Sequence, residues 1–325
     1  MGGAVLSESG AALTDGAAAP NEPVATLTGS AAAWTESATA RTESATASRG
    51  PSGSLGRLAF GFLAVSVLSG VALVPFYSPA RPAESLETLQ GGLPWGFVLR
   101  ALHAYSSFGL LVVTAGHLAQ VLIARTERQL TPSSWWRSVL LLPVTVAALL
   151  GGFALRGDAE AGAALAVWRG VVGTLPVLGS ELARLLVGTI PNDLGAVTLH
   201  HAGTFTLLVW LLTSEHGKRL VPDSRSVVLA GLVSVALAGA IPLPLGSSSG
   251  TARVLLGPWY LLGLQGALVD LPTAAGWLAP LLFVVALGLV RHTGERWRRF
   301  LVALLGAWVV AYAGFTVRIL LISRG

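Results

Sequence analysis

The fold is decided by residues 96–117, GFVLRALHAYSSFGLLVVTAGH, an apolar stretch with His103 near its start and His117 at its end. A second stretch of the same kind, HAGTFTLLVWLLTSEH (201–216), begins and ends with a histidine. An α-helix of about 20 apolar residues crosses the hydrocarbon core of a membrane. Titratable side chains inside a membrane are costly and typically mark a functional site. We therefore expect two membrane helices, each with two functional histidines.

The composition is that of a membrane protein. Of the 325 residues, 53% are hydrophobic and 11% are charged, whereas a soluble domain has about 25% charged residues. The net charge of +5 comes from arginines at the ends of apolar segments, which indicates membrane topology and not nucleic-acid binding. The chain has no cysteine, which excludes disulfides, iron–sulfur clusters held by this chain and thioether-attached haem.

The first 54 residues differ in kind from the rest. They are rich in Ala, Ser, Thr, Gly and Glu, and they contain a short tandem repeat, TESATAR (35–41) followed by TESATAS (42–48). Such a segment cannot bury enough apolar surface to offset the entropy of ordering it. Residues 1–54 are therefore predicted to be a disordered, low-complexity tail.

Seven apolar runs are predicted to span the membrane. They are residues 57–77, 96–124, 138–155, 196–216, 226–245, 276–291 and 299–320. Two further stretches, 175–188 and 254–272, are expected to lie on the membrane surface or to re-enter it. Loop arginines concentrate on the side that receives the N-terminus, so this side is predicted to be cytoplasmic. The expected protein is an all-α, multi-pass protein of a prokaryotic inner (plasma) membrane.

The spacing of the histidines places each pair on one face of its helix. A step of fourteen residues turns an α-helix by about 1400° and a step of fifteen by about 1500°, with rises of about 21–22 Å. Two macrocycles stacked within one bilayer fit this separation. Because both helices are predicted to run in the same direction, the expected pairs are His103 with His201 and His117 with His216. Each pair would give a haem iron two axial imidazoles, an arrangement that moves electrons and does not bind oxygen.

Other interpretations of the histidines stay open. They could form polar contacts between helices or line a proton path. His200 stands beside His201, but it faces about 160° away from His216, so His201 is the predicted ligand. His292 follows Arg291 in a basic loop and is predicted to be a solvated charge.

In its order of segments the chain resembles the cytochrome b family of quinol:cytochrome c oxidoreductases (respiratory complex III), and more closely its photosynthetic counterpart. The resemblance covers about residues 55–320 and includes both histidine spacings. It also rests on four pieces in order: SGVALVPFYSP (69–79), GFALRGD (152–158), LPVLGSELARLL (175–186) and GPWYLLGLQ (257–265).

The resemblance implies a four-helix part with two non-covalent b-type haems (55–220), fused to a three-helix part (221–325). It implies quinol oxidation near the outer surface, coupled to proton translocation, with electrons passing from the outer haem to the inner haem. The implied partners are a Rieske iron–sulfur protein, a c-type cytochrome, membrane lipid and quinone, in a homodimeric complex. Arg100, three residues before His103, matches a family arginine beside a haem propionate, and a guanidinium pairs well with a carboxylate.

One motif departs from the family pattern. Where the family has Pro-Glu-Trp-Tyr, the chain has Gly257, Pro258, Trp259 and Tyr260. The family glutamate accepts a proton from quinol, and proline cannot act as a base. The resemblance still places Tyr260 at the quinol site.

Three functions therefore stay in competition. The first is the dihaem subunit of a quinol-oxidising Rieske/cytochrome b complex. The second is a dihaem adaptor that links the quinone pool to another redox partner without quinol oxidation at the outer site. The third is a transporter or scaffold without haem.

Overall fold

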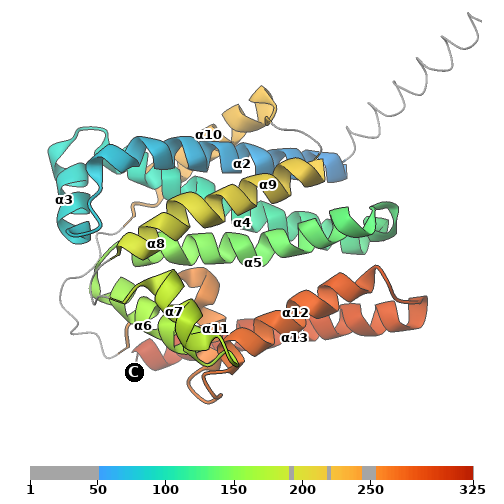
Figure 1. Ribbon diagram of the computed structural model, residues 1–325. Coiled ribbons are helices and arrows are strands. Elements are labelled where there is room, and N and C mark those ends of the chain that lie inside the picture. The colour runs from blue at the N-terminus through green and yellow to red at the C-terminus, as the bar shows by residue number, and fades with distance from the viewer. Residues whose placement is uncertain (1–50, 190–193, 218–220, 244–253, 325) are drawn as a thin grey trace, which may run out of the picture. The chain divides into compact units, whose positions relative to one another are not determined.

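The computed structural model describes most of the chain from residue 51 onward. The described residues are 51–189, 194–217, 221–243 and 254–324, with the side chains of residues 51, 52, 216 and 217 excepted. Residues 1–50, nearly all of the predicted tail, lie outside this part. Throughout the described residues the secondary structure is helical and contains no strand (Figure 1).

Within the described residues, seven apolar helical segments correspond to the seven predicted spans. They are α2 (Pro51–Leu73), α4 (Gly96–Ile123), α5 (Pro132–Ala154), the continuous run of α8 (Gly195–Leu199), η3 (His200–Phe205) and α9 (Thr206–Gly217), α10 (Ser224–Ala240), α12 (Ala275–Val290) and α13 (Glu295–Arg324). Five of these segments are long and apolar enough to cross a membrane, and α10 and α12 are shorter apolar helices. The predicted all-α membrane fold is confirmed.

Helices α2, α4, α5 and α9 pack side by side as a four-helix bundle (Figure 1). Its core includes Phe62 of α2, Leu110 of α4, Leu141 of α5 and Val209 of α9, all of them buried. One helix outside the bundle, α10, packs against both α2 and α4. Because all four helices share one close-packed apolar core, their relative positions are fixed, and so are the positions of their polar side chains along the bundle.

Short helices fill the connections at the ends of the spans. They are α3 (Pro82–Gly92), α6 (Ala159–Gly173), α7 (Gly179–Val187), α11 (Leu262–Ala267) and the single turns η1 (Val74–Phe76), η2 (Thr126–Gln129) and η4 (Trp259–Leu261). Asp158 begins α6, because its carboxylate accepts a hydrogen bond from the Ala161 amide at 2.9 Å. Helix α7 falls within the stretch expected to lie on the membrane surface, and α11 within the stretch expected not to span.

Helices α12 and α13 form a neighbouring pair that contacts the bundle through α12 and α5. The short helix α11 packs against α13 at two glycines, Gly263 and Gly266. A Cβ at either position would come within 2.6 Å of Tyr312 or Phe315 atoms, so only glycine permits this approach. Through this contact α13 supports the chain segment that carries Tyr260.

Candidate functional site

His103 of α4 and His201 of η3 lie next to each other, although they are far apart in the sequence. Their ring centres are 6.0 Å apart and their ring planes are nearly perpendicular, at 89°. An imidazole nitrogen lies ~2 Å from a metal ion that it binds, so two imidazoles on one ion have ring centres about 6 Å apart. The separation therefore fits two imidazoles that would bind one iron.

Hydrogen bonds to the backbone orient both rings. His103 Nδ1 lies 2.9 Å from the Ser66 carbonyl oxygen of α2, and His201 Nδ1 lies 2.8 Å from the Ala148 carbonyl oxygen of α5. A carbonyl oxygen can only accept, so each Nδ1 carries the proton and donates it. Each Nε2 then holds the lone pair that binds metal, which is the usual arrangement of a metal-binding histidine.

Two glycines leave room beside these rings. A Cβ at Gly70 of α2 would lie 2.9 Å from Cε1 of His103, and one at Gly152 of α5 would lie 2.8 Å from Cε1 of His201. Any larger side chain would push the rings aside. The absence of side chains at Gly70 and Gly152 suits a flat macrocycle held between the two imidazoles.

A glycine also faces the histidine at the other end of α4. A Cβ at Gly56 of α2 would lie 3.4 Å from His117 Nε2. Because α2 and α4 run antiparallel, Gly56 faces His117 and Gly70 faces His103. The two glycines are fourteen residues apart, as are the two histidines. The matched spacing of these glycines and histidines is already present in the sequence.

A π-helical turn explains the longer spacing of the second histidine pair. Residues 200–205 form a π-helix, and the Thr206 hydroxyl donates to the His201 carbonyl oxygen at 2.6 Å. A π-bulge takes up one extra residue within an α-helix. The step of fifteen from residue 201 to residue 216 then turns the helix about as far as fourteen regular residues. Residue 216 lies on α9, but the His216 side chain is outside the described residues.

His200, the alternative ligand, is engaged elsewhere. It is buried, with Nε2 2.9 Å from the Leu185 carbonyl oxygen of α7 and Nδ1 3.1 Å from the Thr204 hydroxyl. Both ring nitrogens therefore have partners away from His201. His200 thus links helix α7 to the π-helical turn.

Arg100 lies one turn of α4 before His103. Its Nη1 donates to the Gln90 side-chain oxygen of α3 at 2.7 Å. The guanidinium is thus held at the end of the bundle on which His103 lies. Its role beside a negatively charged group of a cofactor stays a prediction.

Tyr260 is buried at the edge of the bundle, 9% exposed. Its ring centre lies 6.3 Å from that of Phe108, which is on α4 five residues after His103. The Tyr312 hydroxyl of α13 donates to the Tyr260 carbonyl oxygen at 2.5 Å. The Gln265 side chain closes the preceding loop by accepting from the Gly257 amide at 2.8 Å. The sequence-predicted tyrosine therefore lies near the His103 level of the bundle.

The acidic residues after the third span are engaged with an arginine. Arg156 Nη2 lies 2.5 Å from an Asp158 carboxylate oxygen and 3.0 Å from a Glu160 oxygen. Asp158 is also the cap of α6. Both carboxylates thus have structural roles in this loop.

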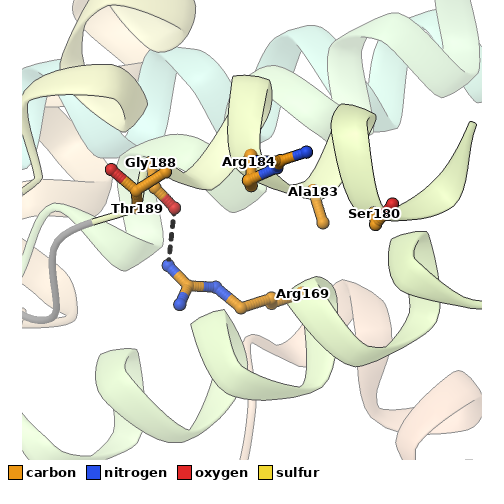
Figure 2. Close-up of a pocket in the computed structure, with 6 residues that line it drawn as sticks. All are labelled: Arg169, Ser180, Ala183, Arg184, Gly188 and Thr189. Atoms are coloured by element: carbon orange, nitrogen blue, oxygen red, sulfur yellow. Dashed lines mark hydrogen bonds between the residues drawn. The ribbon is translucent and has the colours of Figure 1, made fainter.

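A pocket lies between helices α6 and α7, and none of the histidines discussed above lines it (Figure 2). It is lined by Arg169, Ser180, Ala183, Arg184, Gly188 and Thr189. The Arg169 guanidinium donates to the Gly188 carbonyl oxygen at 3.0 Å. Among the described residues, no group of three or more His, Cys, Asp or Glu side chains could hold a bare metal ion. The two-imidazole pair instead suits haem, whose own ring nitrogens provide the remaining ligands.

Comparison with known proteins agrees with this geometry. A family model described as cytochrome b/b6/petB matches residues 52–215, slightly more than half of the chain. Cytochrome b6 of Porphyra purpurea is 25% identical over 162 residues, covering 49% of this chain and 75% of the relative. Cytochrome b of Sulfolobus acidocaldarius is 26% identical over 131 residues, covering 38% of this chain and 23% of the relative.

A solved structure extends the likeness of fold beyond the matched half. A chain of a hyperthermophilic respiratory Complex III superposes with a TM-score of 0.59 and 16% sequence identity. The superposition covers 81% of this chain and 82% of the other. The shared fold therefore includes helices of the C-terminal part.

Proposed function

This chain belongs to the cytochrome b/b6 family, and we propose that it is the dihaem subunit of a quinol-oxidising complex. As a member, it is a multi-pass membrane cytochrome b of an electron-transfer complex, and family members bind b-type haem. The observation that carries the finer proposal is the His103–His201 pair, with both Nδ1 atoms bonded to carbonyl oxygens and a glycine beside each ring.

His103 and His201 hold one haem, and His117 and His216 hold the other about 21 Å away along the bundle. A haem bound at either level supplies a one-electron redox centre. Arg100 would pair with a propionate of the first haem. The two levels together form a route for electrons across the membrane, with the N-terminus on the cytoplasmic side.

The proposed organisation is a four-helix haem-binding domain, residues 55–220, followed by a three-helix domain, residues 221–325. Quinol is oxidised near the His103 level, beside Tyr260, and the partners are a Rieske iron–sulfur protein and a c-type cytochrome. The complex is a homodimer in a prokaryotic plasma membrane. The position of Tyr260 against Phe108 of α4 supports this placement of the quinol site.

A second candidate is a dihaem adaptor that does not oxidise quinol at the His103 level. Pro258 favours this function, because it stands where a proton-accepting carboxylate is expected. A loop carboxylate such as Asp158 or Glu160 could replace the missing proton acceptor. Both are paired with Arg156, however, which favours the adaptor too. Electrons would then enter or leave the quinone pool only at the His117 level.

The first experiment counts haems per chain. We expect the purified protein to show b-type absorption in a reduced-minus-oxidised spectrum, with two haems per chain. His103→Leu and His117→Leu should each remove a different haem, distinguishable by midpoint potential. The control is His292→Gln, which changes an exposed histidine and should retain both haems. One haem per chain would contradict the dihaem proposal, and none would favour the transporter or scaffold.

A second experiment separates the complex subunit from the adaptor. The native complex should reduce cytochrome c with electrons from quinol, and inhibitors of the outer quinol site should block this activity. If quinol reduces only the haem at the His117 level, the adaptor function holds instead.

A further inference from the structure

Serine hydroxyls gather around His103. Ser66 and Ser69 come from α2, and Ser106 and Ser107 follow His103 on α4. The Ser66 and Ser107 hydroxyls lie 2.6 Å apart and join the two helices. Ser106 and Ser107 both donate to the His103 carbonyl oxygen, at 3.1 and 2.7 Å. Of these four described serines, only Ser69 has its hydroxyl within hydrogen-bonding distance of the imidazole ring.

The Ser69 hydroxyl has a defined orientation. It lies 2.6 Å from the Val65 carbonyl oxygen and 3.1 Å from the Ser66 carbonyl oxygen, and it is 4% exposed. A hydroxyl has one proton and donates it to one of these acceptors, as serines in helices commonly do. Its lone pairs are then left for His103 Nδ1, which lies 3.4 Å from Oγ.

His103 Nδ1–H therefore faces two acceptors. The stronger is the Ser66 carbonyl oxygen at 2.9 Å, and the weaker is Ser69 Oγ at 3.4 Å. Shared hydrogen bonds of this kind are common near helix backbones. The partner ring differs, because within the described part of the chain His201 Nδ1 has a single acceptor, the Ala148 carbonyl oxygen. The second acceptor thus acts on one of the two imidazoles.

We propose that Ser69 is a positioning residue that lowers the midpoint potential of the haem held by His103 and His201. This inference rests on the proposed dihaem function. A second acceptor on Nδ1–H increases the electron density that the imidazole gives to the iron, which stabilises the oxidised form. The negative end of the buried hydroxyl dipole points toward the ring, which also stabilises the oxidised form. This dipole is weakly screened in a membrane interior. Neither the hydrogen bond nor the hydroxyl dipole should change the potential of the haem at His117, because that haem lies far from Ser69.

The test is a potentiometric titration of both haems in the purified full-length protein. Ser69→Ala should raise the ratio of reduced to oxidised haem about threefold at the wild-type midpoint of the His103-level haem. At 59 mV per tenfold change for one electron, this is a rise of about 28 mV. The midpoint of the His117-level haem should not change and serves as an internal reference. Ser69→Thr keeps the hydroxyl and should restore the wild-type value.

The matched control is Ser106→Ala. Ser106 is fully buried at the same level and its hydroxyl also donates to the backbone, but it is bonded to the His103 carbonyl oxygen and not to the ring. Its loss should leave the His103-level potential unchanged.

The inference is wrong if the midpoint potential of the His103-level haem is the same in Ser69→Ala as in Ser106→Ala, or lower. It is also wrong if Ser69→Ala shifts the potentials of both haems equally. It is also wrong if Ser69→Thr fails to restore the wild-type potential. The proposed function would fail differently, because the wild-type protein itself would then lack one or both haems. If the wild-type protein holds two haems and Ser69→Ala does not change the His103-level potential, the Ser69 inference alone is overturned.

Discussion

At the His103 level, buried polar side chains bond to backbone carbonyls and to one another, whereas at the α4–α5 loop a buried carboxylate meets a buried guanidinium. Glu127 of η2 is fully buried, and Arg298 of α13 is 5% exposed. Arg298 Nε donates to a Glu127 oxygen at 2.6 Å, and its Nη2 donates to the Leu122 carbonyl oxygen at 2.7 Å. The second region thus joins the end of α4 to the start of α13.

Further hydrogen bonds tie the same two parts together. The Trp135 indole of α5 donates to the Gly288 carbonyl oxygen of α12 at 2.9 Å. Arg291 donates twice to the Leu130 carbonyl oxygen, at 2.9 and 2.6 Å. Each bond crosses between the four-helix bundle and the C-terminal helices.

The comparison separates two uses of buried polarity in a membrane protein. At the His103 level, each imidazole uses one nitrogen to fix its orientation and presents the other to a ligand. At the α4–α5 loop, the charged groups bond to each other and to carbonyl oxygens. The first arrangement indicates a cofactor site, and the second indicates a structural joint. Substitutions of Arg298, Gly70 and Asp223 test this distinction, and their expected effects decrease in that order.

The largest loss of stability is expected from Arg298→Ala. Removing one partner of a buried ion pair leaves an uncompensated charge, which costs about 3–5 kcal/mol. Thermal or denaturant unfolding of the detergent-solubilised protein measures this loss. Arg125→Ala is the control, because it breaks the exposed Arg125–Glu295 pair of the same joint and should cost about 1 kcal/mol or less.

A double replacement sharpens the same test. Glu127→Leu with Arg298→Met removes both charges and keeps the side chains bulky, so it should recover most of the lost stability. If the double variant is as unstable as Arg298→Ala, the ion pair is not the cause of the loss.

A smaller and more local effect is expected from Gly70→Val. The added side chain would meet the His103 ring, since even a Cβ would lie 2.9 Å from Cε1. We expect haem affinity at the His103 level to fall at least tenfold, or about 1.4 kcal/mol, with the His117-level haem retained. Gly239→Val is the control, because a Cβ there meets nothing within 4 Å. Equal haem loss in both variants would contradict a steric role for Gly70.

The smallest effect is expected from Asp223→Ala at the start of α10. The Asp223 carboxylate accepts from the Ser226 amide at 3.0 Å, and losing such a cap costs about 1 kcal/mol. Partial burial raises the pKa of the Asp223 carboxyl, but hydrogen bonds from Ser226 and the charge of Arg57 outweigh it and leave the pKa below its ordinary value.

This lowered pKa gives the Asp223 effect a pH dependence of known sign. The stabilisation is complete above the unfolded-state pKa of ~3.9 and is lost as the pH falls through the lower folded-state value. The difference in unfolding free energy between wild type and Asp223→Ala should therefore shrink in acid. Thr131→Ala removes the uncharged cap of α5 and should cost a similar amount at every pH.

Much of the fold was predictable, because the apolar runs and their lengths are local properties of the chain. Helices α4 and α13 lie where the sequence predicts spans. The short helices α7 and α11 lie within the two stretches that are expected not to span. The ion pair of Glu127 with Arg298 was not predictable. Its members are 171 residues apart, and in the sequence Arg298 is only one of the loop arginines that indicate membrane orientation.

The sequence by itself determined that four histidines occupy two apolar helices at nearly equal spacing, because helical periodicity converts spacing into direction. Only the tertiary structure decided which carbonyl oxygens hold His103 and His201, which glycines face their rings, and that a π-helical turn absorbs the extra residue of the second pair. The same is true of the joint between the bundle and α13. These features depend on which distant segments pack together, and a hydrogen-bond partner across helices leaves no periodic signal in either one.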